Sequence, residues 1–390
     1  MKVILLLAAL MAPVGAVNPM FLDQLPRPAP AGIPSPPSKH LEEEYCHRLK
    51  KLVPNDARVQ YMSAKIRGKT YHYMMGESKS RSPVGTMLLM HGFPDLGFGW
   101  RYQVPYLVCL GYRVVVPDLL GYARSARPRD LCEFSMKSMS MDIIELARRI
   151  AGDEQIILGG HDWGGHLAWR VAMWHPNVVK AMFSVSTPFM APTKPFISME
   201  ALVAPPYNLK NFKYILQFKG REIGNAIRNP ARVREFINAM YGGLDPQGEP
   251  GWQVTSGVAI DKLDTLSRSP LVSDEELNHY TGQFMLQESP PMRGPLSWYR
   301  TRKINWKEER ELAEKQHLEI AMPSLFIAAA RDEALPPALS VGMERYVPKL
   351  SRREVDSGHW ALWETSSQVN EMIGEWLRAN VSSEASSGGE

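Results

Sequence analysis

The sequence predicts an α/β fold with one mostly parallel sheet, helices on both faces and an inserted helical cap. Three observations support this prediction. Short apolar strand-like segments alternate with segments of helical period up to residue 190, and the strand pattern resumes after residue 319. Such alternation is typical of a parallel sheet that is covered on both faces. The residues between are helix-like and rich in aromatic side chains, which favours a cap inserted into one domain over two sequential domains.

The expected elements follow one another in a regular order. The first two strands alternate in polarity like an antiparallel pair, and the later ones are short apolar runs. The helices carry apolar residues at every third or fourth position. In chain order we expect strands at 59–66, 70–75, 84–90 and 112–116, a helix at 136–150, a strand at 155–158, a helix at 165–174, and strands at 178–185, 323–329 and 352–355.

These elements divide the chain into parts. The two parts of the sheet domain are 59–190 and 319–381, and the helical cap is 191–318. Before them, 18–58 holds a proline-rich linker and a short helix, which we expect at 41–52 because Pro54 stops it. The Ser-, Gly- and Glu-rich residues 382–390 form a flexible tail.

The first 17 residues have the pattern of a secretory signal peptide. Lys2 precedes an apolar stretch at 3–12, and the small residues Val14, Gly15 and Ala16 follow Pro13. The apolar run is short for a membrane span, so we expect a secreted protein. An uncleaved signal anchor in the membrane of the endoplasmic reticulum is the alternative.

Composition indicates a packed soluble domain. The 390 residues are 44% hydrophobic and 22% charged, with a formal net charge of +4, and the basic residues are scattered. A nucleic-acid partner is therefore not expected. The three cysteines Cys46, Cys109 and Cys132 have no metal-ligand spacing and support no disulfide framework. Cys109 lies in an apolar run, which predicts a buried thiol.

The chemistry is concentrated in a glycine-rich turn between a strand and a helix. Residues 160–164 read Gly-His-Asp-Trp-Gly, which is the G-x-S-x-G nucleophile elbow with Asp162 in place of serine. An aspartate at this point faces the N-terminus of the next helix, whose dipole favours the carboxylate. The alternative is an ordinary helix N-cap, for which aspartate is a common choice.

Two further loops complete a catalytic triad in the expected chain order. Asp332 follows an apolar strand and His359 comes later, so nucleophile, acid and histidine occur in the order known for the α/β-hydrolase fold. Glu333 competes for the acid role, but Asp332 is closer to the strand end. After the third strand comes His-Gly-Phe-Pro at 91–94, where this fold supplies an oxyanion-hole donor. The backbone N–H groups of Phe93 and Trp163 are the expected pair of donors.

Over nearly all of residues 59–380 the sequence resembles the epoxide hydrolases of the α/β-hydrolase fold. The H-G-F-P, G-H-D-W-G-G and G-H-W motifs occur in the family's order, and the cap contains the matching segments 212–214 and 298–300. One departure is Ala123, where the family often has a second glycine. The resemblance implies that Tyr214 and Tyr299 point at the substrate oxygen. It also places four candidate substrate contacts, His91, Pro94, Trp298 and Trp360.

This resemblance implies conversion of a small hydrophobic epoxide to a vicinal diol without a metal or organic cofactor. Asp162 would form an ester with the substrate, and His359, oriented by Asp332, would activate the water that cleaves it. A haloalkane dehalogenase-like hydrolase is the nearest alternative, although Phe93 stands where such enzymes often have an asparagine. A non-catalytic ligand-binding member of the fold is the second alternative.

Overall fold

The computed structural model describes residues 44–78, 82–314 and 318–381. Within these ranges eight strands form one sheet in the order β1-β2-β4-β3-β5-β6-β9-β10. The pairs β1–β2 and β2–β4 are antiparallel, and the remaining neighbours are parallel. The predicted fold class and the antiparallel first pair are therefore confirmed.

The strands lie close to where the sequence placed them. Those in the middle of the sheet are buried along their whole length because helices cover both faces, and this explains their continuous apolar sequences. Their bounds are β1 Gln60–Ile66, β2 Lys69–Gly76, β3 Thr86–Met90, β4 Arg113–Pro117, β5 Ile156–His161, β6 Val179–Val185, β9 Ser324–Ala329 and β10 Leu350–Val355.

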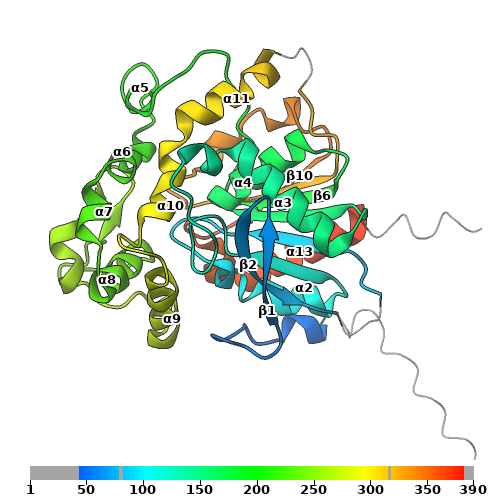
Figure 1. Cartoon of the computed structure of the whole chain (residues 1–390), viewed down its shortest axis with the longest axis horizontal. Helices are drawn as coiled ribbons and strands as arrows, with labels where there is room; N and C mark the ends of the chain where they lie inside the picture. Colours follow the sequence, from blue (N-terminus) through cyan, green and yellow to red (C-terminus); the bar gives the residue numbers. More distant parts are fainter. Residues whose placement is uncertain (1–43, 79–81, 315–317, 382–390) are drawn as a thin grey trace, which may run out of the picture. The chain divides into compact units, whose positions relative to one another are not determined.

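Two layers of helices enclose the sheet (Figure 1). On one face α3 (Met136–Ala151) packs against α4 (Trp163–Trp174), and on the other α2 (Gln103–Cys109) packs against α13 (Ser366–Asn380). Local sequence sets both ends of α3. The Ser135 hydroxyl accepts the Ser138 N–H at its start, and Gly152 ends it at a φ of 65°.

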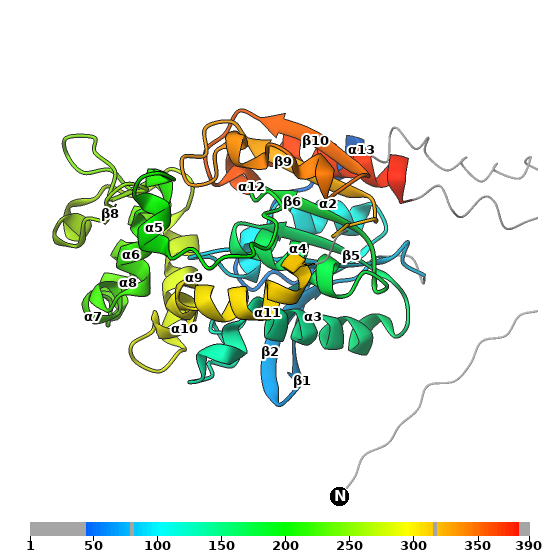
Figure 2. The ribbon, with the colours of Figure 1, turned by 90° about the horizontal axis from the view of Figure 1, so that it is seen from above.

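The residues between β6 and β9 form a mostly helical region beside the sheet domain. Figures 1 and 2 show α5 to α9 lying together beside the sheet domain, with α11 running back toward it. A two-stranded ribbon, β7 (Trp252–Gln253) and β8 (Gly257–Val258), also occurs here, although the sequence indicated no strands. The helices are α5 Met199–Val203, α6 Tyr214–Lys219, α7 Glu222–Ala226, α8 Pro230–Met240, α9 Asp274–Met285, α10 Arg293–Ser297 and α11 Arg302–Glu314.

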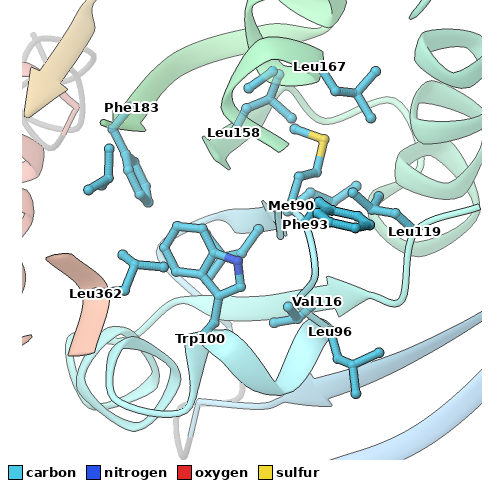
Figure 3. Packing of buried hydrophobic residues seen from close by; sticks show 14 of the residues in the cluster. Met90, Phe93, Leu96, Trp100, Val116, Leu119, Leu158, Leu167, Phe183 and Leu362 are labelled. Carbon is cyan, nitrogen blue, oxygen red and sulfur yellow. The ribbon is translucent and has the colours of Figure 1, made fainter. Parts of the chain in front are cut away.

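A dense apolar core packs around the middle strands of the sheet (Figure 3). Met90 and Leu158 come from adjacent strands, and the Trp100 and Phe183 rings meet edge to face with centroids 6.1 Å apart. Leu362, from α12 (Ala361–Glu364), joins the same cluster. Side chains packed at this density hold the strand ends in fixed positions.

The N-terminal part of the described chain corrects two predictions. Helix occurs over residues 44–47 and does not continue to residue 52. Cys109 is not an isolated buried thiol, because it forms a disulfide with Cys46, and the two Cα atoms are 5.6 Å apart. The two cysteines are separated by 63 positions in the sequence, and no local pattern predicted their pairing. Only the packing of residue 46 beside the end of α2 brings the sulfurs together.

The N-terminal signal segment, most of the linker and the C-terminal tail lie outside the described residues. Within the described ranges, none of the helices combines the length and the apolar character required to cross a bilayer.

Candidate active site

Asp162 sits in a strained turn between β5 and α4. Its backbone has a φ of 52°, a left-handed conformation that is uncommon for a residue with a Cβ. The turn needs close backbone approaches, because a Cβ on Gly164 would lie 2.1 Å from the Met90 carbonyl oxygen. A Cβ on Gly92 would lie 2.4 Å from the Asp162 side chain. Glycine at these two positions therefore allows the carboxyl group to stand between two loops.

The Asp162 side chain does not cap α4. It makes no capping hydrogen bond, and instead its Oδ1 accepts the N–H of Phe93 at 2.7 Å. The Thr187 hydroxyl donates to the Asp162 carbonyl oxygen at 2.8 Å and fixes the backbone behind it. The ordinary N-cap interpretation is therefore wrong, since the carboxylate faces another loop.

His359 stands beside this carboxylate and is held by Asp332. The His359 Nδ1 and Asp332 Oδ2 atoms are 2.8 Å apart, while His359 Nε2 lies 3.7 Å from Asp162 Oδ2. Asp332 is 2% exposed, and its Oδ1 accepts the N–H groups of Ala334 and Leu335. The competing Glu333 is exposed to solvent. The structure thus brings Asp162, His359 and Asp332 together and excludes Glu333.

The charges of the three groups depend on one another. Burial alone would lower the pKa of His359, but Asp332 and then Asp162 outweigh it and raise the pKa to about 9. Burial raises the pKa of Asp162, opposed by His359. For Asp332 burial also favours the neutral form, but His359 outweighs it and lowers the pKa. With a pKa of about 9, His359 is therefore an imidazolium at neutral pH, paired with the carboxylate of Asp332.

Two backbone N–H groups are available to stabilise an oxyanion. Phe93 donates to Asp162 Oδ1, and the N–H of Trp163 also lowers the pKa of Asp162 by hydrogen bonding. The Phe93 N–H thus already holds Oδ1, while Oδ2 lies on the side of His359. Oδ1 would become the carbonyl oxygen of an ester formed through Oδ2.

Two tyrosines from the cap complete the site. Tyr214 begins α6, and Tyr299 lies in the 3-10 turn Trp298–Arg300. Their rings are buried, with centroids 6.3 Å apart, and both line a cavity of about 700 Å³ together with Asp162. Burial raises the pKa of each hydroxyl well above 10. Both phenols are therefore protonated donors at neutral pH.

The four residues expected to contact substrate divide into two groups. Trp298 lines the cavity, with its indole N–H bonded to the Leu120 carbonyl. His91, Pro94 and Trp360 are not among the lining residues in the described part of the chain. His91 is buried with its ring nitrogens on backbone groups of residues 92 and 119.

The other two residues hold loops in place. The Pro94 carbonyl accepts the Tyr241 hydroxyl, and the Trp360 indole donates to the Met240 carbonyl while its ring stacks on Trp363. Pro94 and Trp360 thus stabilise the loops that contain Phe93 and His359. Substrate contact by His91, Pro94 and Trp360 was expected from sequence motifs, but among the described residues these three do not line the cavity, because packing directs their polar groups to backbone partners.

The sequence missed a polar network that joins cap and sheet domain. The Tyr280 hydroxyl of α9 donates to Asp95 at 2.7 Å, and the wholly buried Arg101 lies 2.8 Å from Glu276. Burial raises the pKa of Asp95 to about 7. The sequence feature that could have indicated this network is Asp95, directly after the H-G-F-P motif. Its partner Tyr280 is 185 residues away in the sequence.

Comparisons with known proteins identify the family of this chain. Residues 85–212 match the family model of the α/β hydrolase fold. The chain is 37% identical over 340 residues to the epoxide hydrolase srdG of Neurospora crassa, covering 84% of this chain and 98% of that protein. It is 33% identical to epoxide hydrolase A of Mycobacterium tuberculosis, over 75% of this chain and 89% of that one.

A longer relative and a solved structure extend the comparison. The bifunctional epoxide hydrolase 2 of Rattus norvegicus is 30% identical over 84% of this chain, which spans 57% of the rat protein. The crystal structure of an epoxide hydrolase from Vigna radiata superposes with a TM-score of 0.68 at 22% identity, covering 83% of this chain and 98% of that one, and supports the fold. The chain belongs to the epoxide hydrolases of the α/β-hydrolase fold.

Proposed function

We propose that the protein hydrolyses epoxides to vicinal diols through a covalent ester on Asp162. The proposal rests on the shared cavity, which the half-buried carboxyl group of Asp162 and two buried neutral phenols line together. A carboxylate can attack a strained ring carbon without a general base. The phenols supply what the reaction lacks, which is a proton for the departing alkoxide.

In the first step Asp162 Oδ2 attacks one ring carbon and the bond from that carbon to the ring oxygen breaks. The ring oxygen takes a proton from Tyr214 or Tyr299, which must be neutral to donate it. The Phe93 N–H already holds Oδ1, so the reacting oxygen is directed into the cavity. The product is a hydroxyalkyl ester of Asp162.

Ester formation converts His359 from an acid into a base. The negative charge of Asp162 helps to raise the pKa of His359, and alkylation removes that charge. The pKa of His359 then falls, and its proton passes to the tyrosinate that the first step left behind. The neutral imidazole then accepts a proton from water through Nε2. Water attacks the ester carbonyl, and the N–H groups of Phe93 and Trp163 stabilise the oxyanion on Oδ1. Collapse releases the diol, whose alkoxide takes this proton from His359. The new carboxyl group of Asp162 then gives its proton to His359, which restores the carboxylate and the imidazolium.

A single-turnover reaction in oxygen-18 water tests the ester. With enzyme in excess over a terminal aryl epoxide, the first diol should contain only unlabelled oxygen because its new oxygen comes from Asp162. The label should appear in the Asp162 peptide by mass spectrometry. Label in the first diol would mean that water attacks the epoxide directly, and release of halide from haloalkanes without diol formation would favour the dehalogenase alternative.

We also propose that the protein enters the secretory pathway. The signal-like N-terminal sequence motivates this proposal, and the Cys46–Cys109 disulfide supports it because such bonds persist in oxidising compartments. Protein purified from its source without reductant should have Cys46 and Cys109 resistant to maleimide and Cys132 reactive. Labelling of all three cysteines, together with retention inside the cell, would contradict the proposal.

A further inference from the structure

His166 occupies the reaction cavity but takes no part in the proposed chemistry. It lies in the first turn of α4, and its N–H donates to the Asp162 carbonyl at 3.0 Å. Residues four apart share one face of a helix, so the imidazole lies about one helical turn (~5 Å) along from the nucleophile. Both side chains line the same cavity.

The imidazole of His166 lacks a protein partner on its enclosed edge. Its Nδ1 is buried and has no hydrogen-bond partner among the described residues. The side chain as a whole is half-buried, and the ring packs edge-on to Trp163 with centroids 5.9 Å apart. Because Nδ1 is the enclosed atom, the Nε2 edge is the one that faces the cavity. Unpaired polar atoms inside native proteins are rare, and those at a binding cavity call for an explanation.

The environment keeps this imidazole neutral. Burial, followed by the positive charges of Arg170 and Arg302, lowers the pKa of His166 well below 6.5. A neutral imidazole carries one N–H and one lone pair. An enclosed lone pair is tolerated better than an enclosed N–H group, which places the proton on Nε2. The ring therefore offers a hydrogen-bond donor to the cavity.

Other polar side chains around the cavity already have partners. Arg170 pairs with Glu309 in a two-bond ion pair. The Trp163 side chain is hydrogen-bonded to Tyr299. Apart from the reacting groups, His166 and the solvent-exposed Lys303 are the lining residues whose side-chain polar atoms show no partner within the described ranges. The remaining engaged groups are Thr187, Thr193, Ser198, Glu200, Lys219, Arg300, Arg302, Asn305 and Trp306.

We propose that His166 determines substrate specificity by donating a hydrogen bond from Nε2 to an oxygen atom of the substrate. The oxygen would lie about one helical turn from the carbon that Asp162 attacks. The preferred substrates are then epoxides whose side arm carries an ether, carbonyl or hydroxyl oxygen, rather than pure hydrocarbon epoxides. This inference rests on the proposed function, because it concerns the same cavity.

The test compares terminal epoxides of equal length in which an ether oxygen replaces one methylene two, three or four positions from the ring. For the best position we expect wild-type kcat/KM to exceed that of the hydrocarbon by about tenfold, the effect of one neutral hydrogen bond. His166→Met should reduce this ratio to about one. His166→Gln retains a side-chain N–H and should therefore keep most of the preference for the ether-containing epoxide. The matched control Lys303→Met should leave the ratio unchanged.

Three outcomes would overturn the role of His166. The first is a wild type without oxygen preference at any position, and the second is a His166→Met variant that keeps the preference. The third is an equal loss of kcat/KM by His166→Met on the ether-containing and the hydrocarbon epoxides. Binding of the corresponding diols, measured by calorimetry, is a second measurement that does not depend on turnover. If no epoxide is hydrolysed, the proposed function fails, whereas a diol preference that His166→Met abolishes would still support the binding role.

Discussion

Replacing Asp332 with asparagine keeps the shape of the side chain and removes its charge. In the native site Oδ1 accepts two backbone N–H groups, and Oδ2 faces His359 Nδ1 at 2.8 Å. The asparagine oxygen would keep the backbone bonds, so its NH₂ group would face Nδ1. A donor at that point forces the proton of His359 onto Nε2, the atom that must act as base.

The structure sets the size of the effect. The pKa of His359 stands at about 9 against an ordinary 6.5, which corresponds to about 3 kcal/mol of preference for the imidazolium, and Asp332 is the largest contributor that raises it. Loss of this charge alone slows ester hydrolysis on the order of 10²-fold, and reversal of the tautomer extends the loss to about 10⁴-fold. Ester formation, which does not need His359 as a base, should slow much less.

Rapid quenching and mass spectrometry of the intact protein separate the two steps. Asp332→Asn should accumulate protein heavier by the mass of one epoxide, and the adduct should decay slowly. Glu333→Gln is the matched control, because this neighbouring carboxylate is exposed, and its variant should turn over normally. Ester decay in Asp332→Asn within tenfold of the wild-type rate would refute the assigned role.

Three further predictions address the cap, the pH dependence and the disulfide. Tyr214→Phe with Tyr299→Phe removes both proton donors and should slow ester formation by at least about 10²-fold. The rate can be measured by stopped flow from the fluorescence of Trp163, whose ring lies next to Tyr299. A normal rate would exclude these tyrosines as acids. The pKa of His359 is higher in the folded protein, so its stabilisation is complete below pH 6.5 and lost as pH rises through 9. The free energy of unfolding should therefore fall over that window by about 3 kcal/mol more in wild type than in His359→Gln, and equal losses would contradict the assigned pKa. Cys46→Ser with Cys109→Ser opens a loop of 63 residues and should lower the free energy of unfolding by about 2–4 kcal/mol in denaturant titrations, where no change would show that the bond contributes nothing.

Much of the fold and of the reacting centre could be predicted from local sequence. Buried parallel strands need continuous apolar residues, and the sharp turn at Asp162 needs glycines where backbones touch, so both leave clear patterns. Asp332 and His359 were recognisable because each follows a strand in a fixed chain order. These features depend on backbone conformation, which a few neighbouring residues determine.

Side-chain partners across the chain were decided only by the tertiary structure. Asp332 and Glu333 differ in sequence by one position, and packing buries the first against His359 while it exposes the second. Cys46 and Cys109 meet through the docking of α2, and no pattern in the sequence encodes that contact.

The sequence by itself therefore determined the Asp162 elbow, the order of the triad and the likeness to a family. The tertiary structure decided which polar groups face the cavity. His166 follows Asp162 by one helical turn and reads as an ordinary helix residue until the cap encloses it beside the nucleophile. The physical reason is that backbone conformation is a local property, whereas burial and hydrogen-bond satisfaction belong to the whole packed molecule.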